Sequence, residues 1–224
     1  MMSKFKKYKL VNSGWVLLVL LLFFPQDGNS EISALNLLQS RLVNTKALEG
    51  SFHQEYFDSL QGKKSFSSGT FAFLQPALMK WHYTKPDELE IVIGKKKLWI
   101  FDPVLENVTI KKVDAITDYQ TLASLFKPDQ LLKFFKETQP AKKLLTDDPT
   151  TISIYLAPKK QIPGTVEIQV SFDKNRHYIK QFVIIDANQN YRKISFSNIN
   201  LNPDFHESQF VFTIVEGTEV LEED

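Results

Sequence analysis

The 224-residue sequence contains no cysteine. A secreted chain without cysteine has no disulfide bonds, so its fold must be held by its hydrophobic core alone. The same absence excludes an acylated N-terminus of the kind that bacterial lipoproteins carry, because their lipid is attached to a cysteine that follows the apolar leader. The sequence therefore predicts a soluble protein that is released on the far side of a membrane.

The sequence also lacks the short motifs that mark catalytic and metal sites. It has no HExxH, no G-x-S-x-G, no P-loop and no G-x-G-x-x-G. The four histidines are far apart, and none lies four residues from another: His53, His82, His177 and His206. We therefore expect no metal, no cofactor and no enzymatic activity. A lipid-acting enzyme with scattered catalytic residues remains an alternative.

A strong excess of one charge is missing as well. The chain has 27 basic and 26 acidic side chains. Residues 1–30 hold four of the lysines and one aspartate, so the remaining 194 residues carry a net charge of −2. Nucleic-acid-binding proteins have a large basic excess. The sequence therefore predicts no nucleic-acid partner, and its length suits a single domain.

The one long hydrophobic run is too short for a comfortable membrane span. Lysines at positions 4, 6, 7 and 9 precede an apolar run over residues 15–24, which is followed by the polar residues 25–30. A spanning helix needs about 20 apolar residues. This order is typical of a secretory signal peptide, and we place its end at Ser30. The mature domain is then residues 31–224. An uncleaved N-terminal anchor is the alternative.

Large apolar side chains alternate with other residues in the stretch that runs from Gly69 to Pro103. Phe71 and Phe73 form one such series, and Met79, Trp81 and Tyr83 form a second series across a break at Pro76. A period of two predicts β-strands with one apolar and one polar face. The two strands are therefore expected to pair, with their large apolar side chains on one face that lines an apolar interior.

The rest of the chain adds short strands and a few helices. Helical spacing predicts helices over residues 31–45, 118–126 and 131–135, and alternation predicts further strands, one of them at 210–214. The acidic residues 219–224 are expected to fray. The fold class is therefore mainly β (α+β), with ten or eleven short antiparallel strands and three helices. A sheet of this size curls into a barrel or half-barrel.

Several of these motifs occur together in a known family. They are Gly69-x-Phe71-x-Phe73, Pro76-x-x-Met79-Lys80-Trp81-x-Tyr83-x-x-Pro86, Leu98-Trp99-Ile100-Phe101-Asp102-Pro103, and Phe210-x-Phe212 before Glu216-Gly217-Thr218. With them, the chain resembles the LolA family of periplasmic outer-membrane lipoprotein carriers. The resemblance implies an incomplete antiparallel β-barrel of about 11 strands, whose concave face is covered by three helices that act as a lid.

The resemblance also implies a function and partners. The chain is expected to be a monomer in the periplasm of a Gram-negative bacterium, where it binds lipoprotein acyl chains. It would receive lipoproteins from the inner-membrane ABC transporter LolCDE and pass them to the outer-membrane acceptor LolB. A periplasmic domain of the same fold that senses lipids or lipoproteins is the alternative.

Strand parity and the resemblance together give candidate site residues. The residues expected to line the lipid site are Phe71, Phe73, Met79, Trp81, Tyr83, Ile91, Phe182 and Ile184; ordinary core packing is the alternative for each. The lid candidates are Leu122, Leu125 and Phe126. The family often has an arginine latch where this chain has Gln75, and an uncharged amide should hold the lid more weakly.

Overall fold

The computed structural model describes residues 33–113, 128–176 and 178–223, which lie in one compact unit, Ile32–Asp224. The helices are α1 (Ala34–Val43), α3 (Pro128–Phe134) and the 3-10 helix η2 (Glu207–Phe210). The first six strands are β1 (Ala47–Asp58), β2 (Lys63–Leu74), β3 (Leu78–Lys85), β4 (Leu89–Ile93), β5 (Lys97–Asp102) and β6 (Asn107–Lys112). The others are β7 (Phe135–Glu137), β8 (Thr151–Pro158), β9 (Glu167–Asp173), β10 (Ile179–Ile185), β11 (Tyr191–Leu201) and β12 (Glu219–Glu223).

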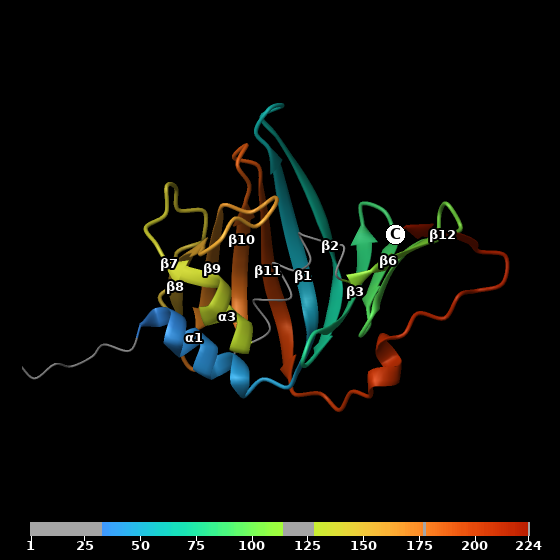
Figure 1. Ribbon diagram of the computed structural model, residues 1–224, viewed down its shortest axis with the longest axis horizontal. Helices are drawn as coiled ribbons and strands as arrows, with labels where there is room; N and C mark the ends of the chain where they lie inside the picture. The colour runs from blue at the N-terminus through green and yellow to red at the C-terminus, as the bar shows by residue number, and fades with distance from the viewer. Residues whose placement is uncertain (1–32, 114–127, 177, 224) are drawn as a thin grey trace, which may run out of the picture. The chain divides into compact units, whose positions relative to one another are not determined.

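All twelve strands belong to one open sheet (Figure 1). Their order is β12-β6-β5-β4-β3-β2-β1-β11-β10-β9-β8-β7. Neighbouring strands are antiparallel except β12, which pairs in parallel with β6. The first half of the chain thus forms a meander that meets the second half where β1 pairs with β11 over nearly its whole length.

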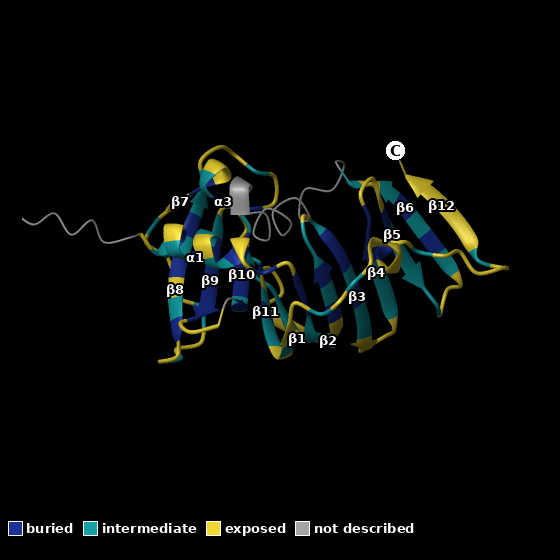
Figure 2. Cartoon of the chain, turned by 90° about the horizontal axis from the view of Figure 1, so that it is seen from below, coloured by how far each residue is buried: buried dark blue, intermediate teal, exposed yellow. Residues whose placement is uncertain are grey.

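The two faces of the sheet bury different side chains. On one face, which we call the helix face, Phe52, Trp81 and Phe182 belong to a large hydrophobic cluster with α1 and α3. On the opposite face, Val183, Ile185 and Tyr191 pack against apolar residues that include the loop residues Leu144 and Leu145. Strand β10 therefore buries side chains on both of its faces, with Phe182 on one and Val183 and Ile185 on the other (Figure 2).

Four expectations about the elements need correction. The part of the chain that the structure describes holds two α-helices rather than three, and the third expected helix, residues 118–126, lies outside it. The sheet has twelve strands rather than about eleven, it is open, and its β12–β6 pair is parallel. The two α-helices pack against each other, and α1 also contacts β8.

The C-terminal segment differs most from expectation. Residues 210–214 are not a strand: η2 ends at Phe210, whose side chain is 1% exposed, and Phe212 packs on Phe101 with ring centroids 5.2 Å apart. Packing on the sheet accounts for Phe210 and Phe212, whereas Val211 and Ile214 are exposed. The acidic tail, expected to fray, forms β12 beside β6.

Candidate functional site

The structure brings all eight predicted lining residues into one hydrophobic cluster on the helix face. Five are at most 6% exposed: Phe71, Phe73, Met79, Trp81 and Phe182. The other three are partly buried and pack against the same cluster: Tyr83, Ile91 and Ile184. The period-two alternation along the strands therefore correctly placed these side chains on a common face. Their contact with lipid stays a prediction.

Cross-strand pairing arranges part of the cluster in rows. Phe71 on β2 lies opposite Trp81 on β3, and Trp81 lies opposite Ile91 on β4. A second row, two residues along, continues from Phe73 through Met79. Directly opposed residues are close enough for their side chains to touch. The rows make a continuous apolar surface that runs across the strands.

Aromatic rings extend this surface over the junction of the two halves of the sheet. The ring of Phe52 on β1 meets Trp81 and Tyr83 edge-on at centroid distances of 4.8 and 4.9 Å. Phe196 on β11 lies 5.8 Å from Phe182 on β10. Such contacts add to the burial of each ring and keep its orientation defined.

Two of these rings, Phe52 and Phe196, were missing from the predicted set. They face each other directly in the β1–β11 pairing. Each stands on a strand whose alternation could be read in the sequence, but their meeting depends on a pairing between segments about 140 residues apart. The sequence contains no local signal for that pairing.

Gly69 shows how closely the strands approach near these rings. It lies opposite Phe52 on one side and Tyr83 on the other. A β-carbon at this position would come within 1.9 Å of the carbonyl oxygen of His82. Only glycine fits, because a β-carbon and a non-bonded carbonyl oxygen cannot lie so close together. The glycine of the Gly69-x-Phe71 motif therefore allows β2 and β3 to pair in this register.

Helix α1 covers part of the cluster with three leucines. Leu35, Leu38 and Leu42 are at most 4% exposed and belong to the cluster. Leu131 of α3 is fully buried in the same cluster. The predicted lid residues, Leu122, Leu125 and Phe126, lie outside the described residues. The observed cover therefore consists of α1 and α3.

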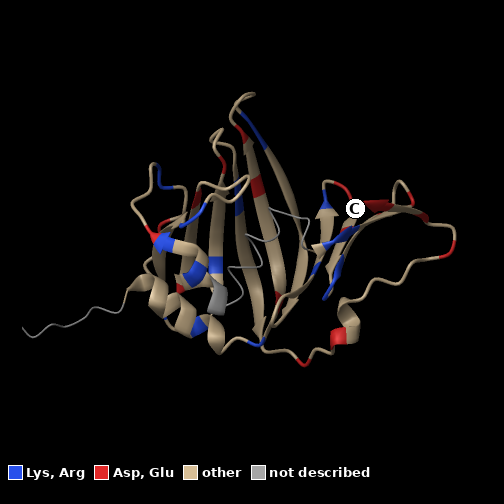
Figure 3. Ribbon diagram, in the orientation of Figure 1, with Lys and Arg blue, Asp and Glu red and all other residues tan. Residues whose placement is uncertain are grey.

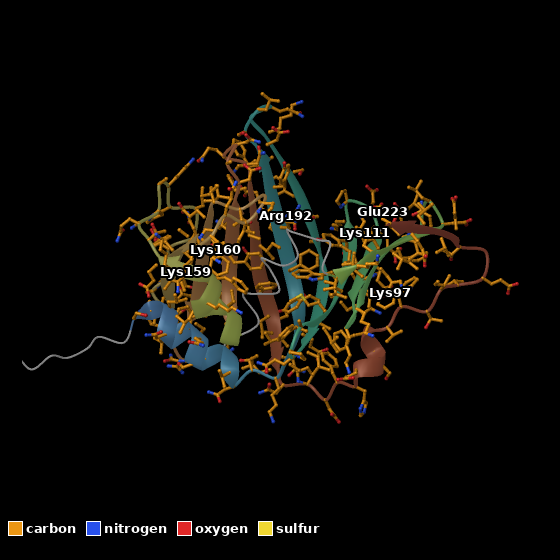
Figure 4. All side chains as sticks on the ribbon, in the orientation of Figure 1. Lys97, Lys111, Lys159, Lys160, Arg192 and Glu223 are labelled. Atoms are coloured by element: carbon orange, nitrogen blue, oxygen red, sulfur yellow. The ribbon has the colours of Figure 1, made fainter. Side chains whose placement is uncertain are left out.

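Polar contacts hold the ends of these helices. The Gln75 side-chain amide donates to the Leu42 carbonyl at 3.0 Å, near the C-terminal end of α1. The Glu137 carboxylate accepts from the Leu35 backbone N–H at 2.8 Å, in the first turn of α1, where a negative charge is favourable. The Lys159 ammonium donates to the Leu132 carbonyl of α3 at 2.6 Å (Figure 4). Gln75 thus contacts a helix of the cover, as a latch would.

Charge stays outside the cluster. Burial raises the pKa of the Tyr83 hydroxyl, and the nearby positive charge of Arg192 only partly opposes this. Tyr83 is therefore neutral at physiological pH. Arg192 lies opposite Ile184 in the β10–β11 pairing and brings a positive charge to the border of the cluster. The cluster itself offers apolar contact.

A cavity of about 720 Å³ lies where the C-terminal segment meets the sheet. It is lined by Thr70, Lys80 and His82, which alternate in sequence with Phe71 and Trp81 and so point away from the helix face. Lys80 is paired there with Glu90 at 2.6 Å. Phe71, Phe205 and Phe210 also line this space, so its walls combine polar and apolar groups.

Neither a membrane span nor a metal cluster occurs in the described ranges. No helix there is long and apolar enough to cross a bilayer. Likewise, no three His, Cys, Asp or Glu side chains in those ranges are grouped as metal ligands would be.

Comparisons with known proteins identify one family. Residues 43–213 match the family model "Outer membrane lipoprotein carrier protein LolA". An outer-membrane lipoprotein carrier protein of Francisella philomiragia is 29% identical, over 93% of this chain and 97% of that protein. A protein of the same name from Xanthomonas axonopodis pv. citri is 31% identical, over 79% of this chain and 82% of that protein.

A solved structure shares the fold at low sequence identity. An uncharacterized conserved protein from Thermus thermophilus superposes with a TM-score of 0.52 and 12% identity, covering 84% of this chain and 98% of that one. The family match covers most of the chain and includes the strands that carry the apolar rows. The chain therefore belongs to the outer membrane lipoprotein carrier protein LolA family.

Proposed function

We propose that this protein carries lipoproteins by sheltering their acyl chains in the helix-face cluster. The observation that carries the proposal is the continuous apolar surface built from the predicted residues together with Phe52 and Phe196. Family membership supports the same conclusion. A carrier needs no chemical step, only apolar contact, so we propose that the protein is not an enzyme.

The energy of an exposed acyl chain explains why a carrier is needed. Moving a chain from an apolar environment into water costs about 0.8 kcal/mol per CH₂ group, so fifteen groups cost about 12 kcal/mol. Two or three such chains on one lipoprotein would prevent its unaided passage between membranes. A soluble protein that buries those chains removes this barrier.

We interpret the described arrangement of α1 and α3 as a closed cover. Trp81 is 5% exposed and Phe182 is fully buried, so an acyl chain reaches them only if helices move away. A closed cover suits the empty carrier, because a large exposed apolar patch promotes aggregation. We propose that α1 and α3 are displaced on loading, that Leu122, Leu125 and Phe126 belong to the same moving cover, and that Gln75 restrains it.

The carrier role implies a route and partners. We propose that residues 1–30 are removed on secretion and that residues 31–224 act as a monomer in the periplasm. The LolCDE transporter of the inner membrane would supply the lipoprotein, and the LolB acceptor of the outer membrane would receive it. Transfer in this direction requires only that the affinity for the acyl chains increases from the transporter to the carrier and from the carrier to the acceptor.

A pair of charge insertions on β3 and β4 tests the acyl site. Trp81→Glu and Ile91→Glu should each reduce the recovery of acylated lipoproteins with the purified protein by at least tenfold, because a carboxylate on the helix face must be desolvated when a chain binds. The measurement is mass spectrometry of lipoproteins that co-purify from the periplasm.

His82→Glu is the matched control, because it places the same carboxylate on β3 but on the opposite face. Circular dichroism should show that each variant folds; Ile91 is half-buried, so Ile91→Glu remains informative if Trp81→Glu unfolds the protein. Normal cargo recovery by a folded Ile91→Glu variant would place the acyl chains elsewhere.

A further inference from the structure

The edge of the sheet opposite to β7 is closed by a strand that buries none of its side chains. All five residues of β12 are exposed. The strand pairs in parallel with β6, with Val220 opposite Val108 and Glu223 opposite Lys111. Three of its five residues are glutamates. Figure 3 shows this acidic strand beside lysines of the neighbouring strands.

Ion pairs and backbone hydrogen bonds hold β12 in place. The Lys111 ammonium lies 2.7 Å from Glu223, and the Lys97 ammonium lies 3.8 Å from Glu222 (Figure 4). Such pairs contribute little at an exposed site. The apolar residues of the strand, Val220 and Leu221, remain 44% and 41% exposed. A strand with so little buried apolar area opens readily compared with the core strands.

The chain before β12 is anchored independently of it. Phe210 is almost fully buried, and Phe212 packs on Phe101. Residues 213–217 between this anchor and β12 are exposed, and Gly217 adopts a positive φ of 91°. Strand β12 can therefore leave β6 by a change in this short connection while the aromatic anchor stays on the sheet.

Departure of β12 would uncover a basic sheet edge. Strand β6 would present unpaired backbone N–H and C=O groups, which are a template for another extended chain. Lys111 on β6 and Lys97 on the adjoining β5 would lose their acidic partners. An edge with these lysines repels a like-charged strand, so the segment that fits it best is an acidic one.

From these contacts we propose that the β6 edge is a docking site for an acidic, extended segment of a partner protein. The segment adds to the sheet in place of β12, in the geometry and with the ion pairs that β12 itself displays. The site lies at the far end of the strand order from β7 and β8, next to which α1 and α3 pack. The proposal concerns protein recognition and does not depend on the acyl cargo.

A labelled peptide tests whether the edge accepts such a segment. The probe has the sequence of residues 216–224, and its binding is measured by fluorescence anisotropy on the full chain and on a Val220→Pro, Leu221→Pro double variant. Adjacent prolines remove two consecutive backbone donors, so β12 can no longer form its ladder with β6. We expect the probe to bind the double variant at least tenfold more tightly than it binds the unchanged chain.

Charge controls show whether the recognition is the proposed one. A probe with glutamine at positions 219, 222 and 223 should bind at least tenfold more weakly, and added salt should weaken the original probe. Adding Lys97→Gln and Lys111→Gln to the double variant should have the same effect as the altered probe. The matched control adds Lys63→Gln and Lys85→Gln instead, which lie on β2 and β3, and should leave binding unchanged.

Three outcomes would overturn the proposal: equal affinity of the probe for both chains, equal binding of the glutamine probe, and a dimer of the unchanged chain that the prolines abolish. The dimer would show that β12 of a second copy is the natural occupant. Uptake of an acylated lipopeptide should be the same with and without the prolines. A loss of uptake in Ile91→Glu is independent of this result, so failure of the cargo site and failure of the docking edge are distinguishable.

Discussion

At the scale of single residues, the most strongly perturbed carboxyl group lies outside the apolar cluster. Asp148 accepts hydrogen bonds from both the hydroxyl and the backbone N–H of Thr150, at 2.6 and 2.8 Å. The ammonium of Lys180 lies 3.0 Å from Asp148 and 3.6 Å from Asp173. These contacts, the hydrogen bonds from Thr150 first, lower the pKa of Asp148 to about 2. They fasten the loop before β8 to β10.

The lowered pKa predicts a dependence of stability on pH. Because the folded pKa of Asp148 lies below its unfolded value of 3.8, its contribution is complete above pH 4 and is lost as the pH falls towards 2. Asp148→Asn should therefore flatten the decrease in the free energy of unfolding between pH 4 and 2. Urea unfolding at a series of pH values measures this slope.

Asp147→Asn is the control, because Asp147 is the exposed neighbour of Asp148. It should leave the slope as it is in the unchanged protein. An unaltered slope in Asp148→Asn would show that the hydrogen bonds from Thr150 do not persist in solution.

At the scale of elements, α1 is the part of the cover that the structure defines best. Its three buried leucines attach it to the sheet, while Gln75 and Glu137 bind backbone groups near its two ends. Gln75 lies in the turn between β2 and β3, and its backbone N–H donates to the Lys46 carbonyl at 2.8 Å. The turn therefore links strands β2 and β3 to helix α1.

Substitutions of Gln75 should change how firmly α1 is held. Gln75→Leu removes the donor to the Leu42 carbonyl and should lower the free energy of unfolding by about 1 kcal/mol. Gln75→Arg supplies a charged donor, whose hydrogen bond is about twice as strong. Transfer of a lipoprotein from the loaded carrier to an acceptor should be faster with leucine and slower with arginine, measured by the appearance of cargo on acceptor-containing vesicles.

Gln54→Leu provides the comparison, because the Gln54 amide bonds to Ser67 within the sheet and to no helix. It should cost a similar amount of stability without changing transfer. Equal transfer rates for all three substitutions would show that the Gln75 hydrogen bond does not control the opening of the cover.

The elements also show what the sequence could predict. The alternation of Met79, Trp81 and Tyr83 is local, and it correctly placed their side chains on one face. The row that joins Phe52 to Phe196 depends on the long-range β1–β11 pairing, which no local pattern encodes. Strand β12 was missed for a related reason. Its glutamates suggest a solvated tail until the lysines of β5 and β6 are known to lie beside them.

At the scale of the whole sheet, the chain separates apolar and charged functions. The helix face carries the cluster proposed for acyl chains, and the β6 edge carries the lysines proposed for an acidic partner. None of the eight predicted lining residues lies on β5, β6 or β12. The cargo site can therefore change its cover without altering the docking edge, which is what a protein that meets different partners when empty and when loaded requires.

The central claim about the whole molecule is that loading replaces internal apolar contacts with contacts to acyl chains. A diacylated lipopeptide should then stabilise the folded protein by about 2.7 kcal/mol when its free concentration is 100 times its dissociation constant. Calorimetric titration at several temperatures should give a negative heat-capacity change, because the acyl chains leave water. The same peptide without acyl groups is the control and should do neither. Stabilisation by that control would mean that the peptide part is recognised, and a heat-capacity change near zero would mean that the chains stay in water; either result would contradict a carrier that works by burying lipid.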